Sequence, residues 1–197
     1  MLKSWFGKSD SRQTGESLYL SAVEQARQPV LYTHMNVPDT VDGRFDMIAT
    51  HVFLILRRLK AGDDETQAAS QALFDAMFGD MDRGLREMGA GDLGVGRRVK
   101  AMAQAFYGRV AAYETGLGTP DATPDATSDA APDGVLADAV LRNVFRGDDQ
   151  EREAAKRLAD YMHQQMAALS AQPLEGFLEG KVAFAAIDPT DSGAGEV

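Results

Sequence analysis

The sequence predicts an all-α fold: a single helical domain of about six to eight helices around a central buried helix at residues 41–59. Three observations support this prediction. Apolar residues recur at steps of three and four through most of the chain, as they do on one face of an α-helix. The chain shows no series of alternating apolar and polar residues of the kind that marks strands. At 197 residues it has the length of one domain, able to bury roughly 70% of the surface that the unfolded chain exposes.

The chain before the central helix is predicted to hold a flexible segment and one helix. Residues 1–16 carry basic residues but no long apolar run, so we expect a flexible N-terminal segment. A helix is predicted over residues 17–28, because apolar residues fall near one face and Pro29 follows.

The helix predicted at residues 41–59 is apolar on nearly every side, as is typical of a helix that other helices surround. Asp39 and Thr40, which follow Pro38, can each accept a hydrogen bond from the amides of a first helical turn. Arg57 and Arg58 lie near the negative end of its dipole. Its apolar positions are Val41, Phe45, Met47, Ile48, Val52, Phe53, Leu54, Ile55, Leu56 and Leu59.

Two amphipathic helices are predicted next, joined by a glycine-rich loop. The first runs from Thr66 to about Met88, after a capping box formed by Asp64 and Gln67. The second runs from about residue 95 to residue 115, where apolar residues again follow the helical period.

The segment at 117–134 is predicted to be a flexible loop within a helical domain that spans residues 17–187. It repeats Pro-Asp-Ala-Thr at positions 120 and 124 and lacks large side chains, so it buries too little apolar area to offset its ordering entropy.

The last part of the chain is predicted to form two helices, a strap and a tail. The helices are expected at residues 135–145 and 149–172, the second capped by Asp148. Residues 174–187 are apolar and predict a short extended strap. Residues 188–197 are expected to be a disordered tail.

Several short motifs together resemble a known protein family, the ubiquinol-cytochrome c chaperones. The resemblance extends over roughly residues 17–113, although the loop at 117–134 is longer than the family pattern. The motifs are Pro38-Asp39-Thr40, Asp42-Gly43-Arg44-Phe45, His51, Arg58-Leu59, Leu73-Phe74, Asp80-Met81-Asp82, Leu85-Arg86-Glu87-Met88-Gly89, Gly91-Asp92 and Phe106-Tyr107-Gly108-Arg109.

This resemblance implies an assembly chaperone, not an enzyme, that binds newly made cytochrome b during biogenesis of ubiquinol-cytochrome c reductase. It implies no cofactor. Mitochondrial relatives imply two further partners, the ribosome and a small partner subunit. The alternative that the residues leave open is a metal-dependent all-α enzyme acting on a phosphate or prenyl substrate.

Composition limits the classes of partner and chemistry. The formal net charge is −10, which argues against general nucleic-acid binding because such binding requires a basic surface. Cysteine is absent, so disulfides, thiolate metal sites and cysteine nucleophiles are excluded. The first residues lack the apolar core of a secretion signal, so we expect a cytoplasmic protein, with peripheral contact to the cytoplasmic face of the inner membrane as an open alternative.

Carboxylates near the start of the central helix allow two interpretations. Asp39, Asp42 and Asp46 are spaced to share a helix face, and with Asp80 and Asp82 they could hold Mg²⁺. The simpler interpretation is capping plus a salt bridge from Asp42 or Asp46 to Arg44, Arg83 or Arg86.

Glycines and histidines give weaker signals. Gly89, Gly91 and Gly94 match a dinucleotide fingerprint, but that chemistry needs a preceding strand, so we interpret them as an inter-helix loop. His51, on an apolar helix, predicts a hydrogen-bonded core residue. A haem carrier would have to use His34 or His51.

A basic cluster stands out because it breaks a local rule. Arg97, Arg98 and Lys100 fall in the predicted first turn of a helix, where the dipole disfavours cations. They either pair with nearby acids (Asp80, Asp82, Glu87 or Asp92) or remain open to an acidic partner, RNA or lipid headgroups.

Methionines are numerous and either fill the core or line a client groove. The signature segment, the basic cluster and the methionines together supply the candidate residues for partner or client binding. These are Asp39, Asp42, Arg44, Arg97, Arg98, Lys100, Met81 and Met88.

Overall fold

The computed structural model describes residues 3–60, 62–89, 91–118 and 132–187. Over these residues the chain forms eight α-helices and one 3-10 turn and no strand, so the all-α prediction is confirmed. The helices are α1 (Lys3–Ala26), α2 (Pro29–Thr33), α3 (Val41–Leu59), α4 (Asp64–Glu87), α5 (Asp92–Leu117), α6 (Pro132–Asn143), α7 (Arg152–Ser170) and α8 (Leu174–Leu178), and the 3-10 turn η1 covers Asp149–Glu151.

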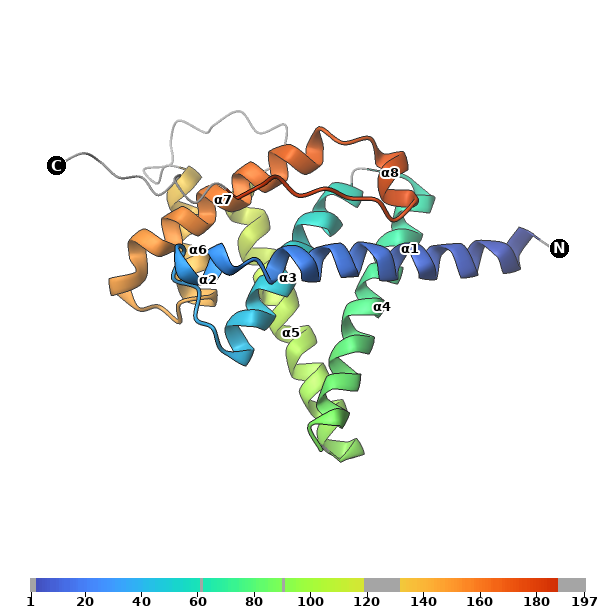
Figure 1. Ribbon diagram of the computed structural model, residues 1–197, viewed down its shortest axis with the longest axis horizontal. Coiled ribbons are helices and arrows are strands. Elements are labelled where there is room, and N and C mark those ends of the chain that lie inside the picture. The colour runs from blue at the N-terminus through green and yellow to red at the C-terminus, as the bar shows by residue number, and fades with distance from the viewer. Residues whose placement is uncertain (1–2, 61, 90, 119–131, 188–197) are drawn as a thin grey trace.

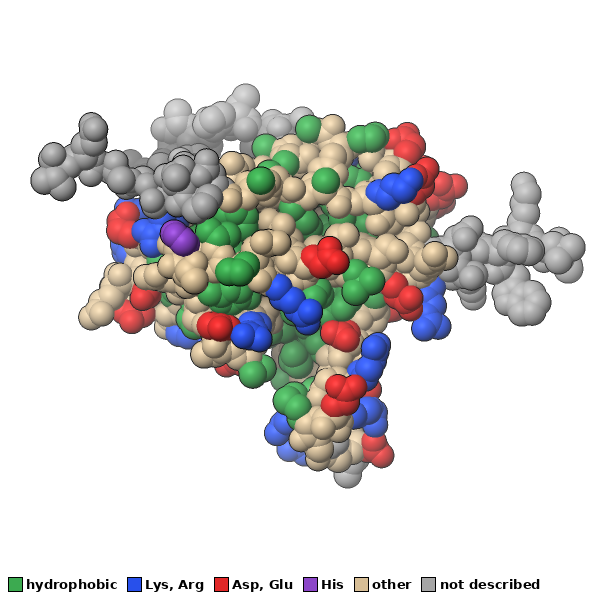
Figure 2. Space-filling model, viewed as in Figure 1, with side chains coloured by type: hydrophobic (Ala, Val, Ile, Leu, Met, Phe, Trp, Pro, Cys, Tyr) green, Lys and Arg blue, Asp and Glu red, His purple; other side chains and the backbone are tan. Residues whose placement is uncertain are grey.

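The helices pack in a continuous series around one apolar core. Helix α1 crosses α3 and α4, α6 packs between α5 and α7, and α7 also contacts α3 (Figure 1). Helices α4 and α5 run antiparallel to each other as a hairpin, and its far end projects from the body of the molecule (Figures 1 and 2). We call this unit the α4–α5 hairpin, and the residues around Met88 and Asp92 its tip.

Helix α3 has the bounds that the sequence predicts, and it packs against α1, α4 and α7. The Thr40 hydroxyl accepts a hydrogen bond from the Gly43 amide at 3.1 Å, which satisfies one of the amides that a first turn leaves unpaired. The buried residues run almost without interruption along the middle of the helix, from Asp46 to Ile55. The Thr40 cap, the charges near the helix ends and the burial pattern thus all favour a helix at residues 41–59.

Helix α1 begins earlier than the sequence predicts. Its helix starts at Lys3, so most of the range 1–16 is helical, and residues 1–2 lie outside the described residues. Thr14 is buried and donates a hydrogen bond to the Leu178 carbonyl at 2.9 Å. A Cβ on Gly15 would lie 2.4 Å from the Ala72 backbone, so two small residues let α1 approach α4 closely. Tertiary contact, which leaves no local periodicity, explains the difference.

Two helix starts also differ from the predicted positions. The cap of α4 is Asp63, not Asp64, and it accepts hydrogen bonds from the amides of Glu65 and Thr66. Helix α5 begins at Asp92, three residues before the predicted start. Gly89 and Gly91 therefore lie between the two helices, as predicted, whereas Gly94 lies within α5, where the prediction is wrong. Gly89 adopts the positive φ of 83° that glycine permits.

The strap predicted at residues 174–187 is found only in its second part, because residues 174–178 form α8. After α8, residues 181–187 are extended along α7. Gln165 of α7 and Gln172, just after its end, each exchange two hydrogen bonds with the strap backbone, at Ala185 and Ala183 respectively, over distances of 2.6–3.1 Å. The two side-chain amides thus supply the hydrogen bonds that the backbone of a neighbouring strand would otherwise supply.

Most of the remaining predicted segments lie outside the described residues. This applies to residues 119–131 of the predicted loop at 117–134 and to the predicted tail at 188–197. Helix α7 is preceded by η1, whose cap Asp148 accepts a hydrogen bond from the Gln150 amide at 3.0 Å.

Candidate functional site

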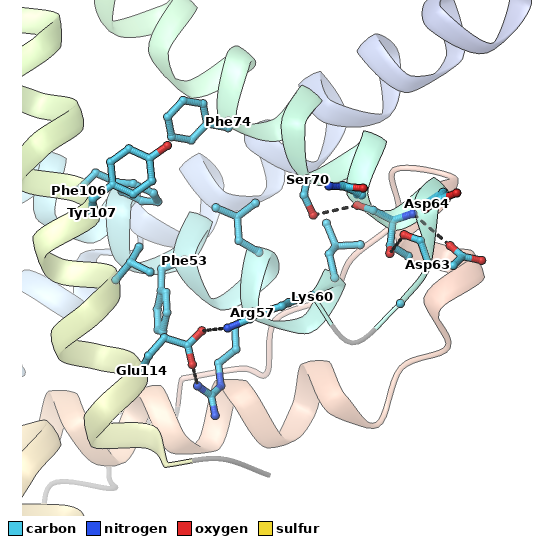
Figure 3. Close-up of a pocket in the computed structure, with 16 residues that line it drawn as sticks. Phe53, Arg57, Lys60, Asp63, Asp64, Ser70, Phe74, Phe106, Tyr107 and Glu114 are labelled. Atoms are coloured by element: carbon cyan, nitrogen blue, oxygen red, sulfur yellow. Dashed lines mark hydrogen bonds and ion pairs between the residues drawn. The ribbon is translucent and has the colours of Figure 1, made fainter. Parts of the chain in front are cut away.

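A groove opens at the surface between α3, α4 and α5 (Figure 3), with a volume of about 520 Å³. Its floor and one wall are apolar, and its two ends are charged. The residues that line it are Phe53, Leu56, Arg57, Leu59, Lys60, Gly62, Asp63, Asp64, Thr66, Gln67, Ser70, Phe74, Phe106, Tyr107, Val110 and Glu114.

Aromatic side chains form the apolar wall of the groove. Phe74 of α4 contacts Phe106 and Tyr107 of α5, with ring centroids 6.0 and 5.7 Å apart. Phe106 is buried and anchors the cluster, whereas Tyr107 is 59% exposed. An exposed aromatic ring on a rigid, partly buried cluster offers a large contact area at little entropic cost. This wall is the part of the surface best suited to bind an apolar segment.

Charged residues close the two ends of the groove. Glu114 forms an ion pair with Arg57 and lies 3.7 Å from Lys60. Asp63 and Asp64 lie at the other end, at the start of α4 (Figure 3). The groove therefore combines an apolar centre with a polar rim, the usual composition of a protein-binding site. None of these residues was among the sequence candidates.

A buried ion-pair cluster fixes α5 against α3. The Asp46 carboxylate is fully buried and forms ion pairs with Arg109 of α5 and with Arg146, the latter at 2.8 Å. Arg109 also lies over the Phe45 ring, 5.4 Å from its centroid. Burial raises the pKa of Asp46, and the two guanidinium groups act in the opposite direction by favouring the carboxylate.

The salt bridge predicted from Asp46 to Arg44, Arg83 or Arg86 is wrong, because Asp46 pairs with residues far away in sequence. The other predicted carboxylates do not converge either. Asp39 pairs with Arg44 at 2.7 Å on the surface. Asp82 pairs with Arg86, while Asp80 accepts a hydrogen bond from Tyr19. Asp42 is exposed at the start of α3. Within the described part of the chain, no three acidic or histidine side chains are grouped to hold a metal ion.

The basic cluster lies on the exposed surface of α5. Arg97, Arg98 and Lys100 occupy the second and third turns of this helix, not the predicted first turn, because α5 begins at Asp92. The predicted pairing with neighbouring acids is not found: over the described residues, no carboxylate forms an ion pair with these three cations. Asp82 and Asp92 instead share Arg86.

The two candidate methionines, both on the α4 segment, differ in exposure. Met81 is half-buried and packs against the core, whereas Met88 is 67% exposed at the hairpin tip. Met47, Met77 and Met162 are fully buried and fill the core. The groove described above is lined by aromatic residues instead of methionines, and a role of Met81 and Met88 in binding stays a prediction.

His51 is the hydrogen-bonded core residue that the sequence predicts. Its Nδ1 lies 2.7 Å from the Met47 carbonyl, which can only accept, so Nδ1 carries the proton. Nε2 then accepts from the Tyr161 hydroxyl at 2.6 Å, and that hydroxyl accepts from Gln25 at 3.1 Å. The ring of Phe184 in the strap packs edge-on against His51. The network joins α1, α3, α7 and the strap, and both His51 nitrogens are occupied.

This network predicts a pH-dependent stability. Burial lowers the pKa of His51 to about 4, whereas in the unfolded chain its pKa is about 6.5. The unfolded state therefore takes up a proton as the pH falls through this window, and the folded state does not. The stabilisation is fully present above the unfolded pKa. Between about pH 7.5 and about pH 5.5 the free energy of unfolding should fall by about 1.3 kcal/mol through this residue alone.

Urea denaturation at the two pH values measures the effect. His51→Gln should remove this part of the pH dependence, while His34→Gln, at an exposed position, should leave it as in the parent protein. An identical pH dependence in the parent and in His51→Gln would contradict the assignment.

The comparisons with known proteins agree with one another. A family model described as ubiquinol-cytochrome C chaperone matches residues 33–184. The ubiquinol-cytochrome c reductase complex assembly factor 1 of Drosophila melanogaster is 25% identical over 187 residues, which cover 92% of this chain and 68% of that protein. The Xenopus laevis protein of the same name is 20% identical over 161 residues, covering 82% of this chain and 74% of that one.

A solved structure is also similar. The crystal structure of the Cbp3 homolog from Brucella abortus superposes with a TM-score of 0.77 and 32% sequence identity. The match covers 96% of this chain and 98% of the other. Fold and sequence similarity therefore extend over the same, nearly complete length.

Proposed function

Because the chain belongs to the ubiquinol-cytochrome c chaperone family, we propose that its client is newly made cytochrome b, held in the groove between α3, α4 and α5. The protein is an assembly factor for ubiquinol-cytochrome c reductase and not an enzyme. The cytochrome b client and the groove as its binding site are the two parts of the proposal.

The observation that supports the groove is its aromatic wall. Tyr107 and the half-buried Phe74 present an apolar surface that the helices of this chain leave uncovered, and the buried Phe106 supports them. A client rich in transmembrane helices exposes apolar side chains before it is inserted, and shielding them from water lowers the free energy of the complex. The charged ends, with Arg57 and Glu114 on one side, can orient the polar flanks of such a segment.

The proposed place of action is the cytoplasmic face of the inner membrane, where such a client is inserted. No helix in the described residues is long and apolar enough to cross a bilayer. A small partner subunit and the ribosome, which the family resemblance implies, are further proposed partners.

A single substitution on the aromatic wall tests the groove. Tyr107→Asp should reduce co-purification of cytochrome b with the tagged protein about tenfold, because it removes an exposed aromatic anchor and adds a charge to an apolar contact. The matched control is Leu20→Asp, which changes an apolar side chain of equal exposure, 60%, on α1. Both variants should unfold at nearly the parent's urea midpoint.

Comparison of the two variants distinguishes a loss of binding at the groove from a general effect of adding a charge to the surface. If Leu20→Asp loses as much cytochrome b as Tyr107→Asp, the groove is not the site. If deletion of the gene leaves assembled ubiquinol-cytochrome c reductase at its normal level, the assembly role itself is refuted.

A further inference from the structure

The basic cluster on α5 is unusual in a protein of formal net charge −10. Arg97, Arg98 and Lys100 are exposed, and over the described residues no carboxylate pairs with them. Three such cations within four positions create a local positive potential on an otherwise acidic molecule.

The position of the cluster on α5 directs it outward. Successive residues of an α-helix are rotated by about 100°, which places Arg97 and Lys100 away from the inner side of α5 and Arg98 at the edge of that side. That inner side includes Val95 and Phe106, both fully buried or nearly so. The outer side carries little bulk: Ala101 and Gly108 are exposed, and a Cβ on Gly108 would meet nothing within 4 Å. The cluster is therefore open to a flat surface.

The acids of the hairpin do not neutralise the cluster. Asp82 and Asp92 both bind Arg86, at 2.6 and 2.5 Å. Asp80 accepts a hydrogen bond from Tyr19 on α1. Glu87, the remaining acid near the tip, is exposed on α4. The positive charge of the outer face thus exceeds the negative charge near it.

An exposed apolar side chain lies at the same end of the hairpin. Met88 is 67% exposed at the tip, where the hairpin projects from the body (Figures 1 and 2). Cations at the same end of the hairpin as an exposed apolar side chain match the boundary of an anionic bilayer, where headgroups are negative and the acyl region is apolar. RNA would instead favour an exposed aromatic ring for base stacking. Tyr107, the exposed aromatic residue of α5, lies about two turns beyond the cations.

We propose that Arg97, Arg98, Lys100 and Met88 form a docking surface for a bilayer that contains anionic lipid headgroups. The cations bind the headgroups, and Met88 enters the interface. The proposal concerns how the protein is placed at a membrane, and it holds whether or not cytochrome b is the client.

Vesicle flotation with the full-length protein tests this surface. The protein should bind vesicles made of an equal mixture of phosphatidylcholine and phosphatidylglycerol, should not bind phosphatidylcholine alone, and should be released by high salt. Replacing the three cations by glutamine should weaken binding by roughly 100-fold, at roughly fivefold for each cation. Met88→Ser should weaken it severalfold without changing its salt dependence.

The matched control removes the same charge elsewhere. Arg12→Gln with Arg44→Gln and Lys181→Gln changes three exposed cations that are paired with carboxylates, and it should retain most of the binding. Equal losses in the two triple variants would overturn the proposal, as would failure of the parent protein to bind the mixed vesicles at low salt. If a structured RNA binds the parent tightly and the mixed vesicles do not, the lipid assignment is wrong and the surface binds nucleic acid.

Discussion

Arg109→Gln is expected to destabilise the fold by about 4 kcal/mol, because it leaves the buried Asp46 carboxylate without its main partner. Asp46 is fully buried and Arg109 is 11% exposed, whereas the second partner, Arg146, is 51% exposed and more strongly screened by water. Removing one member of a buried pair is costly because the remaining charge has lost its hydration and its counter-charge together.

Urea denaturation of the parent protein, Asp46→Asn, Arg109→Gln and the double variant measures this effect. The double variant Asp46→Asn with Arg109→Gln should be more stable than the sum of the two single losses predicts, since no charge is then left buried alone. The control is Arg152→Gln. Arg152 pairs with Asp138 and Asp149 at the surface, so its loss should lower the free energy of unfolding by less than ~1 kcal/mol. Simple additivity in the cycle, or an equal loss in the control, would contradict the role assigned to Asp46.

Gly43→Ala is expected to destabilise the fold by about 3 kcal/mol, although alanine is the better helix former. A Cβ at this position would lie 1.9 Å from the Pro38 carbonyl oxygen, a backbone atom that cannot move without shifting the chain that leads into α3. The Thr40 cap, which binds the Gly43 amide, belongs to the same turn. Overpacking against backbone therefore outweighs the gain in helix propensity.

Gly84→Ala provides the opposite case in the same protein. Gly84 lies within α4, and a Cβ there would meet nothing within 4 Å. This variant should be more stable than the parent by about 0.5–1 kcal/mol, as the propensity difference alone predicts. Thermal and urea denaturation of both variants check the signs. A stabilised Gly43→Ala would mean that the close approach to Pro38 is not rigid.

The elements that local chemistry determines could be predicted from the sequence. Helix α3 was predicted with correct bounds because the Thr40 cap, the flanking charges and an almost continuous apolar pattern all favour one segment. His51 was predicted as a core residue because it lies within that pattern. The family was predicted from short motifs whose combined order is specific, although each alone is common.

The contacts that join distant segments could not be predicted in the same way. Asp46 pairs with Arg109, which lies 63 positions further along the chain, and with Arg146, which lies about a hundred positions further along. Helical periodicity carries no information about such distant pairs. The early start of α1 depends on Gly15 meeting Ala72. The groove forms only where three helices converge, so the sequence alone does not show that Tyr107 lines a groove.

The length of the α4–α5 hairpin sets a spacing between two parts of the surface. From Gly91 to Tyr107 along α5 is roughly 24 Å, at 1.5 Å for each residue. Any object that touches only the hairpin tip is therefore held roughly 24 Å from the groove. A polypeptide leaving the groove would need about seven extended residues to cover the gap. The hairpin is in this sense a spacer, and lengthening or shortening both helices by whole turns would change how soon a released segment reaches that object.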